Sequence, residues 1–430
     1  MRYDNALFCR ESCVFQFLYS QLIRLILPFI LLRLWWQGRK APALRLDIGH
    51  RVGLAPRLPG PVVWVHAVSV GETIAAAPMV RRLLARDPQI TILMTAMTDT
   101  GLAQARKMFG NRVRYAYAPY DTPGSIRRFL NRTRPRILVI METEIWPNMI
   151  RQSRARGVPV FLINARLSER SARGYERIRS LALPIMQSIS WVAAQAEKDA
   201  ERFRRIGVVP DKVEVTGSVK FDVDIPPDVR QAARDLRTRL AGRPVWIAGS
   251  THGGEDAQLL TAHQELLAAH PDALLILVPR HPERFDSVAN KVMSRGLTVA
   301  RRSLGEDPAD AQVYLGDTMG ELMMLYGASD IAFVGGSLIE RGGHNPLEPA
   351  GWGIPVFSGP HVFNFETIYQ RLLDDTGVKI VANAEELATF LISLFSHPAE
   401  REAIGRRALS VVNKNRGALE KVVEGIIERV

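Results

Sequence analysis

Residues 62–95 read VVWVHAVSVGETIAAAPMVRRLLARDPQITILMT. The β-branched and other apolar residues at the two ends predict buried strands at 62–66 and 90–95. The segment between them repeats apolar residues at the spacing of an amphipathic helix. Apolar strands joined through helices form parallel sheets that are covered on both faces. The stretch therefore predicts one strand–helix–strand unit of a parallel sheet.

The same alternation continues along the chain and separates into two sets. The first set predicts strands at 62–66, 90–95, 114–118, 137–141, 160–164, 191–194 and 213–216. The second set predicts strands at 245–248, 274–278, 297–300, 313–315, 331–334, 356–358 and 379–381. Between the sets, FDVDIPPD (221–228) interrupts the periodicity with a proline pair and three acids, which is typical of a linker.

The two sets predict an α/β fold of two Rossmann-like, doubly wound domains that face a cleft. Ligands bind such folds at the carboxyl ends of the strands, so the chemistry is expected in the strand-to-helix loops. We place an N-terminal extension and membrane anchor at 1–40, an N-terminal domain at 41–222 and a C-terminal domain at 223–430.

Composition fits a large globular protein and excludes several classes. The 430 residues are 47% hydrophobic and 23% charged, which excludes a disordered or collagen-like chain. Basic residues exceed acidic ones, 56 against 44, for a net charge of +12. The two cysteines, Cys9 and Cys13, lie near the N-terminus. A disulfide scaffold and a cysteine-built zinc site in the main body are therefore excluded.

The N-terminal region predicts a membrane segment. Seventeen of the 23 residues from 14 to 36 are apolar, and a helix of this length, ~35 Å, could cross a bilayer. Arg24 near its middle keeps open the alternative of a helix that lies in the membrane plane. Arg39, Lys40, Arg45, Arg51 and Arg57 outnumber Asp47 after the segment, which predicts a cytoplasmic body. A cleaved signal peptide is the rival interpretation, but no small-x-small site follows Trp36.

Glu72 lies where the first predicted strand passes into its helix. Ser69 and Glu72 have the spacing of a capping box, in which the carboxylate only satisfies backbone amides. The alternative is that Glu72 is a general base at the mouth of the cleft. A helix N-terminus lowers a carboxyl pKa, so such a base needs an opposing influence, for example a second carboxylate.

The second carboxylate is expected from METEIWPN (141–148). Glu142 and Glu144 follow a buried strand, where charge must be paired or used. The plain alternatives are a solvated loop acid or a helix N-cap partner. Lys220 lies just before the linker and could stabilise negative charge in a ligand held by both domains. By itself a lysine at a linker is a weak signal.

Five strand-end loops of the second domain together predict a nucleotide pocket. One is the small-residue loop around Ser250, of the kind that presents backbone amides to an anion. Arg280 and His281 follow the next strand and suit a phosphate or carboxylate. The other loops hold Met319, Gly320 and Glu321, then Gly336, and finally Asn345, Pro346, Leu347 and Glu348. Glu348 is placed for ribose hydroxyls.

The sequence predicts no metal site and no cofactor. His252, His281, His344 and His361 are far apart and lack metal-ligand spacing, and no Asp-x-Asp motif follows a predicted strand. Met319, Met323 and Met324 are expected to be helix core.

Seven motifs in order resemble those of the 3-deoxy-D-manno-octulosonic acid (Kdo) transferases of lipopolysaccharide biosynthesis. They are HAVSVGE (66–72), METEIWPN (141–148), TGSVKFD (216–222), STHGGED (250–256), VPRHPERF (278–285), GDTMGEL (316–322) and GGSLIERGGHNPLEPAGWGIPVFSGPHVFNF (335–365). The resemblance runs from about residue 14 to the end. Gly253 departs from it, since the family generally has an acidic side chain there. The first dozen residues, with Cys9, look like an extra extension or the product of an upstream start codon.

The resemblance implies a GT-B glycosyltransferase of two Rossmann-like domains, anchored on the cytoplasmic side of the inner membrane. It implies transfer of Kdo from CMP-Kdo to the lipid A precursor lipid IVA, with inversion and without a metal. Glu72 would be the general base, supported by Glu142 and Lys220. Nucleotide contacts would fall at Arg280, His281, Met319, Gly320, Glu321, Asn345, Pro346, Leu347 and Glu348.

The sequence leaves two rival functions open and predicts one basic surface. A related transferase with a UDP-hexosamine donor would keep the fold. A membrane-tethered binder of nucleic acid or anionic lipid would use the positive charge, but aromatic residues are only 7% and no stacking platform accompanies the basic residues. Eight arginines between 151 and 180 are expected either to face anionic headgroups and acceptor phosphates or to form a solvated helix face. The oligomeric state is left open.

Overall fold

The structure, a computed structural model, describes residues 2–37, 39 and 47–429 and divides into two compact units. Unit 1 comprises Met1–Val219 together with Gly417–Val430, and unit 2 comprises Lys220–Arg416. Each unit contains one seven-stranded parallel sheet. The two predicted sets of strands are therefore confirmed.

The sheet of unit 1 has the strand order β3-β2-β1-β4-β5-β6-β7, the Rossmann order with one added edge strand. His66 of β1 pairs with Ile140 of β4, so the two chains leave the sheet side by side at its carboxyl edge. The strands are β1 (Val62–His66), β2 (Thr91–Ala96), β3 (Arg114–Tyr117), β4 (Pro135–Met141), β5 (Val160–Ala165), β6 (Trp191–Ala194) and β7 (Val213–Val215).

Alternate residues of these strands enter two different cores, which is why the strands are apolar throughout. Trp64 packs with α5, α6, α8 and α9 on one face, and Val63 and Val65 pack with α3, α4 and α18 on the other. The helices of this unit are α1 (Arg2–Gln37), α2 (Ile48–Arg51), α3 (Val70–Arg86), α4 (Asp99–Phe109), α5 (Pro123–Thr133), α6 (Pro147–Arg154), α7 (Glu169–Arg177), α8 (Arg179–Ser188), α9 (Glu197–Arg205) and α18 (Ala418–Glu428).

The sheet of unit 2 has the order β10-β11-β9-β8-β12-β13-β14, a Rossmann order extended by the short edge strand β10. Its strands are β8 (Val245–Thr251), β9 (Leu274–Pro279), β10 (Val299–Arg301), β11 (Val313–Leu315), β12 (Ile331–Val334), β13 (Val356–Ser358) and β14 (Val378–Ile380). Its helices are α10 (Pro227–Arg239), α11 (Asp256–Ala269), α12 (Phe285–Ser294), α13 (Leu322–Gly327), α14 (Leu347–Trp352), α15 (Glu366–Asp374), α16 (Ala384–Ser396) and α17 (Pro398–Lys414).

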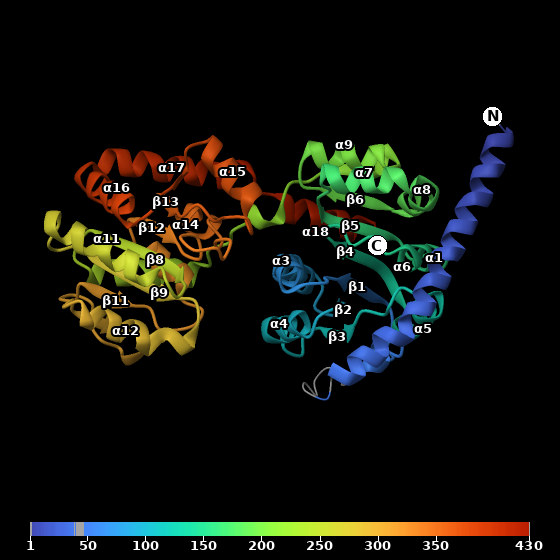
Figure 1. The fold of residues 1–430 in the computed structure, drawn as a ribbon, viewed down its shortest axis with the longest axis horizontal. Coiled ribbons are helices and arrows are strands. Elements are labelled where there is room, and N and C mark those ends of the chain that lie inside the picture. The colour runs from blue at the N-terminus through green and yellow to red at the C-terminus, as the bar shows by residue number, and fades with distance from the viewer. Residues whose placement is uncertain (1, 38, 40–46, 430) are drawn as a thin grey trace. The chain divides into compact units, whose positions relative to one another are not determined.

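The division into units differs from the predicted one at two points. Phe221 and Ile225, inside the predicted linker, are buried in unit 2, so the boundary falls at Val219 rather than at 222. The chain then returns to unit 1 for α18, whose apolar side packs against α3 (Figure 1). The predicted domain 223–430 therefore ends too late by this division.

The N-terminal segment is helical as predicted. Within α1, Val14–Trp36 is long and apolar enough to cross a membrane, and only a small part of it is buried against the protein. Length and composition alone do not distinguish a spanning helix from one lying in the interface.

Candidate active site

Glu72 lies in the first turn of α3 and makes the contacts of the predicted capping box. The Ser69 side chain accepts a hydrogen bond from the Glu72 amide at 3.3 Å. In return the Glu72 carboxylate accepts from the Val68 amide and the Ser69 hydroxyl, both at 2.8 Å. The carboxylate is held in one orientation at the carboxyl edge of the sheet.

The capping contacts do not exclude a chemical role for Glu72. Burial raises its pKa, the two hydrogen bonds lower it, and the negative charges of Glu144 and Glu142 raise it further. The net direction is upward, which is the opposing influence that a base at a helix N-terminus requires. The two interpretations of Glu72 are therefore compatible.

Glu142 and Glu144 follow β4, the strand next to β1, and so lie at the same carboxyl edge of the sheet. The Glu142 amide donates to Ile163 of β5 at 3.0 Å, and its backbone adopts a left-handed conformation with φ 56°. This conformation is uncommon for a residue with a side chain and marks a constrained turn. Glu144 accepts from the indole N–H of Trp146 at 3.0 Å, and burial followed by Glu142 raises its pKa.

The chain before Lys220 is held by a residue that sequence reasoning missed. Asn164, buried and left-handed at φ 51°, is the last residue but one of β5. It accepts from the Ser218 hydroxyl at 3.2 Å and the Val219 amide at 3.3 Å. Asparagine tolerates this conformation better than most residues, which is a signal that the sequence alone did not single out. Lys220 itself is half-buried and opens unit 2.

In unit 2 a buried carboxylate organises two of the predicted loops. Glu255 accepts four backbone hydrogen bonds: from His252 at 2.9 Å, Gly336 at 2.7 Å, and Ser337 and Leu338 at 3.0 Å each. The amides of His252 and Gly336 are thus engaged by Glu255. For His252 this differs from the expectation that the loop around Ser250 presents its amides to an anion. Ser250 lies within β8 at φ 59°, almost fully buried.

Three histidines meet at this edge, which corrects the expectation that they are far apart. His252 and His344 stack with ring centroids 5.2 Å apart and share a hydrogen bond between their Nε2 atoms at 2.9 Å. His281 meets His252 edge-on, also at 5.2 Å. Their strands β8, β9 and β12 are neighbours in the sheet, so residues distant in sequence become adjacent.

The surroundings favour the neutral form of two of these rings, His252 and His344. Burial lowers the pKa of His344 to about 4, with His252, Arg280 and His281 contributing. Burial also lowers the pKa of His252, followed by the charges of His281 and nearby arginines. Among the described residues, no group of three or more His, Cys, Asp or Glu side chains is arranged to hold a metal ion. Neutral rings beside Arg280 can donate to, or accept from, a polar ligand without repelling its cationic contacts.

Asn345 and Glu348 join the same region. The Asn345 side chain accepts from the Leu347 amide at 3.1 Å and donates to Glu348 at 3.4 Å. Burial raises the pKa of Glu348, while Asn345 and Arg280 lower it. Pro346 begins the turn into α14, and Leu347 is core. The structure thus places Asn345 and Glu348 in contact, with Arg280 close enough to lower the pKa of Glu348. His281 lies beside His252.

The loop after β11 lies one strand further along the sheet. Glu321 is bound through both oxygens by Arg302, at 2.7 and 3.0 Å, which lowers its pKa. Met319 is 55% exposed, contrary to the expectation of helix core, whereas Met324 is buried as expected. Gly320 adopts φ 91°, which favours glycine.

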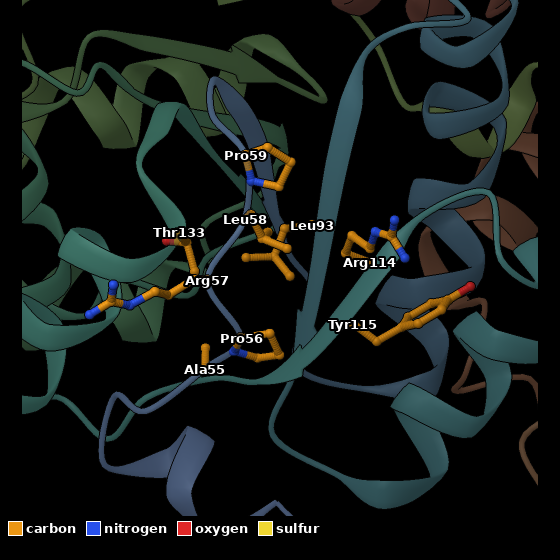
Figure 2. A pocket seen from close by; sticks show the side chains of 9 residues that line it. All are labelled: Ala55, Pro56, Arg57, Leu58, Pro59, Leu93, Arg114, Tyr115 and Thr133. Atoms are coloured by element: carbon orange, nitrogen blue, oxygen red, sulfur yellow. The ribbon is translucent and has the colours of Figure 1, made fainter.

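Unit 1 also contains a pocket of about 300 Å³ (Figure 2). Pro56, Leu58, Arg114, Tyr115 and Thr133 are among its lining residues. They precede or begin strands, whereas Glu72 follows one. The pocket contains none of the predicted site residues, and we assign it no role in the chemistry.

Sequence comparisons agree with the geometry. Residues 46–223 match the family model described as 3-Deoxy-D-manno-octulosonic-acid transferase (kdotransferase). The chain is 40% identical to the 3-deoxy-D-manno-octulosonic acid transferase of Haemophilus influenzae, over 96% of this chain and 98% of that protein. This chain belongs to the Kdo transferase family. The Kdo transferase of Bordetella pertussis is 37% identical over 95% of this chain and 98% of its own length.

Solved structures support the fold of this Kdo transferase. The UDP-GlcNAc 2-epimerase from Neisseria meningitidis matches with a TM-score of 0.54 and 16% identity, over 86% of this chain and 100% of that one. S. aureus MnaA matches with a TM-score of 0.52 and 13% identity, over 85% and 96%. At such identities the likeness concerns the fold alone. It confirms the predicted GT-B-type architecture of two Rossmann-like units.

Proposed function

We propose that this Kdo transferase moves Kdo from CMP-Kdo to lipid IVA, with inversion at the reacting carbon and without a metal ion. The observation that carries the proposal is a cluster of three glutamates in unit 1, Glu72, Glu142 and Glu144, which we call the carboxylate cluster. Glu72 is fixed by two hydrogen bonds, and burial and two neighbouring glutamates raise its pKa. A carboxylate with a raised pKa at a strand end suits the removal of a proton from a sugar hydroxyl.

The proposed reaction moves one proton and exchanges one bond at the anomeric carbon of Kdo. Glu72 takes the proton of the acceptor hydroxyl as its oxygen forms a bond to the anomeric carbon of Kdo. The bond from that carbon to the phosphate oxygen breaks, and CMP leaves with the electron pair. Attack from the face opposite the leaving group inverts the configuration, through an oxocarbenium-like state.

Positive side chains supply the charge stabilisation in this proposal. CMP and the carboxylate of Kdo are both anionic, and fixed cations near developing negative charge are a large catalytic term. Lys220 and Arg280 take this part, and Glu142 supports the cationic sugar centre.

The donor nucleotide is assigned to the carboxyl edge of the unit 2 sheet. His281, Asn345 and Glu348 form its polar wall, with Glu348 on the ribose hydroxyls and Pro346 and Leu347 setting the turn. Met319, Gly320 and Glu321 contact it from the next loop. Ser250 and Gly336 contribute shape: a Cβ at Gly336 would lie 3.1 Å from His344, so glycine leaves room for the stacked histidines.

The donor is tested with the purified full chain, lipid IVA and mass spectrometry of the lipid product. We expect a mass increase of one or more Kdo units with CMP-Kdo and none with UDP-N-acetylglucosamine. Product from the UDP-sugar alone would replace this proposal with the UDP-hexosamine alternative. The number of additions follows from the same spectrum.

The pH profile of kcat/KM tests whether Glu72 is the base and whether the carboxylate cluster raises its pKa. A base works when ionised, and the raised pKa of Glu72 means that activity is lost on acidification earlier than for an ordinary glutamate. Glu144→Gln removes a neighbouring charge yet keeps an acceptor for Trp146. The acidic limb should therefore move to lower pH. Glu144→Asp keeps the charge and is the control. A limb that stays in place in Glu144→Gln contradicts the assigned base.

We also propose a location on the cytoplasmic side of the inner membrane. The apolar segment Val14–Trp36 and the excess of basic residues that follows it support this location. The expected partners are CMP-Kdo, lipid IVA and the anionic membrane surface, with no nucleic acid.

A further inference from the structure

The apolar segment of α1 has two different sides along its length. The less exposed side comprises Gln16, Tyr19, Ser20, Gln21, Ile23, Leu27, Ile30, Leu31 and Leu34. The exposed side is mainly apolar and includes Phe15, Leu18, Leu22, Leu25, Phe29, Leu32 and Trp36. Both sets repeat at intervals of three or four residues, as opposite faces of one helix do. One side of α1 is therefore partly covered within unit 1.

Two hydrogen bonds fix the covered side to the body of unit 1. The Tyr19 hydroxyl donates to Asp121 at 3.0 Å, and the Ser20 hydroxyl donates to the Asn148 side chain at 3.1 Å. Ser20, Asp121 and Asn148 are all at most 5% exposed. The helix also packs against α8 (Figure 1). We call this set of four residues the latch.

The latch is built into the start of α6. Asp121 also accepts from the Asn148 amide at 2.9 Å and the Met149 amide at 2.7 Å, so it satisfies the first amides of that helix. The Asn148 side chain returns a bond to the Asp121 carbonyl at 2.7 Å. Burial raises the pKa of Asp121 to about 6 against these hydrogen bonds and Arg151. A buried polar network of this kind is costly to leave half-satisfied.

The latch is incompatible with a helix that crosses the bilayer. Tyr19 and Ser20 lie inside the 23-residue apolar segment. If that segment spanned the membrane, these residues would sit in hydrocarbon, and Asp121 and Asn148 would either follow them or lose their partners. The helices next to the latch carry the exposed arginines Arg151, Arg154 and Arg179, which do not enter hydrocarbon readily.

The segment 151–180, which runs from the end of α6 to the start of α8, instead suits a membrane surface. All eight arginines between 151 and 180 are exposed: Arg151, Arg154, Arg156, Arg166, Arg170, Arg173, Arg177 and Arg179. The two acidic residues of this segment form ion pairs: Glu169 with Arg173, Arg202 and Arg205, and Glu176 with Arg205. Basic residues beside an exposed apolar helix are typical of proteins that lie on anionic lipid.

We propose that α1 lies along the surface of an anionic bilayer, docked on unit 1 by the latch, and does not cross it. Its exposed apolar side enters the lipid, Arg24 and Arg33 reach back to the headgroups, and the arginines of α6, α7 and α8 contact the same headgroups. Both ends of the apolar segment then lie on one side of the membrane. This proposal does not depend on the sugar donor or on Glu72.

Topology is tested by cysteine labelling of the full chain in bacterial membranes. In a Cys9→Ser, Cys13→Ser background, Asp4→Cys reports the side before the apolar segment, and Glu428→Cys reports unit 1. An impermeant maleimide should label both in inside-out vesicles and neither in intact spheroplasts. Labelling of Asp4→Cys from the spheroplast exterior, with Glu428→Cys protected, would overturn the proposal.

Cross-linking tests the latch in the membrane-bound protein. In the same background, Ser20→Cys with Asn148→Cys should react with a short bismaleimide at least tenfold more than Leu25→Cys with Asn148→Cys, because Leu25 is on the exposed side. Equal yields from the two pairs would show that α1 leaves unit 1 in the membrane. Should either pair misfold, the single-cysteine topology result still decides.

Vesicle flotation tests the lipid chemistry. The full chain should bind phosphatidylglycerol vesicles more tightly than phosphatidylcholine vesicles at low salt. Reversal of Arg170, Arg173 and Arg177 to Glu should reduce that preference at least tenfold without changing the labelling pattern. An unchanged preference would remove the arginines from the proposed surface.

Discussion

Glu72→Gln should lower kcat/KM for Kdo transfer by about 10²–10⁴-fold, the usual contribution of a positioned general base. Glutamine keeps an oxygen that can accept from the Val68 amide or the Ser69 hydroxyl, so the start of α3 should persist. What it loses is the ability to take a proton. We therefore expect a loss in kcat with little change in the affinity for CMP-Kdo, measured by steady-state kinetics and calorimetry.

The chain offers a matched control for the capping function of Glu72. At the start of α16, the Glu386 side chain accepts from the Ala382 amide at 2.7 Å, and its own amide donates to Asn383 at 3.0 Å. The spacing of these contacts is the same as in the Glu72 cap, but Glu386 does not belong to the carboxylate cluster. Glu386→Gln should leave kcat within about twofold of the wild type, since surface changes of this kind are usually small. Equal losses in the two variants would reduce Glu72 to a helix cap.

The strands could be predicted because parallel strands are apolar along their whole length. The ends of the strands were predicted less accurately. The predicted strand 245–248 continues to Thr251 as β8, through Gly249 and Ser250. These small residues keep the pairing with β9 only with a register shift between Gly249 and Thr251. An apolar run cannot indicate such an irregular extension.

The periodicity of an amphipathic helix does not predict which part of the protein its apolar face packs against. The apolar spacing of Leu419, Val422, Val423 and Ile426 predicts a helix with a buried face. The same face could pack on either sheet. The structure places it against α3 and Trp191 of unit 1. A Cβ added at Gly425 would lie only 2.5 Å from the Trp191 indole, so this close approach favours glycine there.

The composition of the candidate site was predicted in part. Glu72, Glu142 and Glu144 could be grouped from sequence because each follows a predicted strand. The histidine cluster was missed because only the spacing along the chain was considered. Sequence separation says little about residues at the ends of parallel strands, since the order of strands in the sheet decides which ends meet. His252, His281 and His344 are brought together by the order β9-β8-β12.

Glu255→Gln should destabilise unit 2 by about 3–5 kcal/mol, the largest loss of stability that we expect from a single change. Its carboxylate is 0% exposed and accepts four amide N–H groups. A glutamine side chain accepts through one oxygen and turns an NH₂ group toward the remaining donors. At least two charge-assisted hydrogen bonds are then lost, each worth about 1.5–3 kcal/mol when a buried donor is left unsatisfied.

Hydrogen exchange measures this change in the unit where it arises. In the full chain, amides of β8 and β12 should exchange about 10²–10⁴-fold faster in Glu255→Gln, whereas amides of β1 and β4 should keep their protection. Glu265→Gln is the matched control, because Glu265 is exposed on α11, the helix that directly follows Glu255, and should change exchange by less than about threefold. Because Glu255 holds His252 and Gly336 in place, CMP binding should weaken with the loss of local protection. Full protection of β8 and β12 in Glu255→Gln would mean that water or a rearranged loop satisfies the four amides, and that the carboxylate does not organise this edge of the sheet.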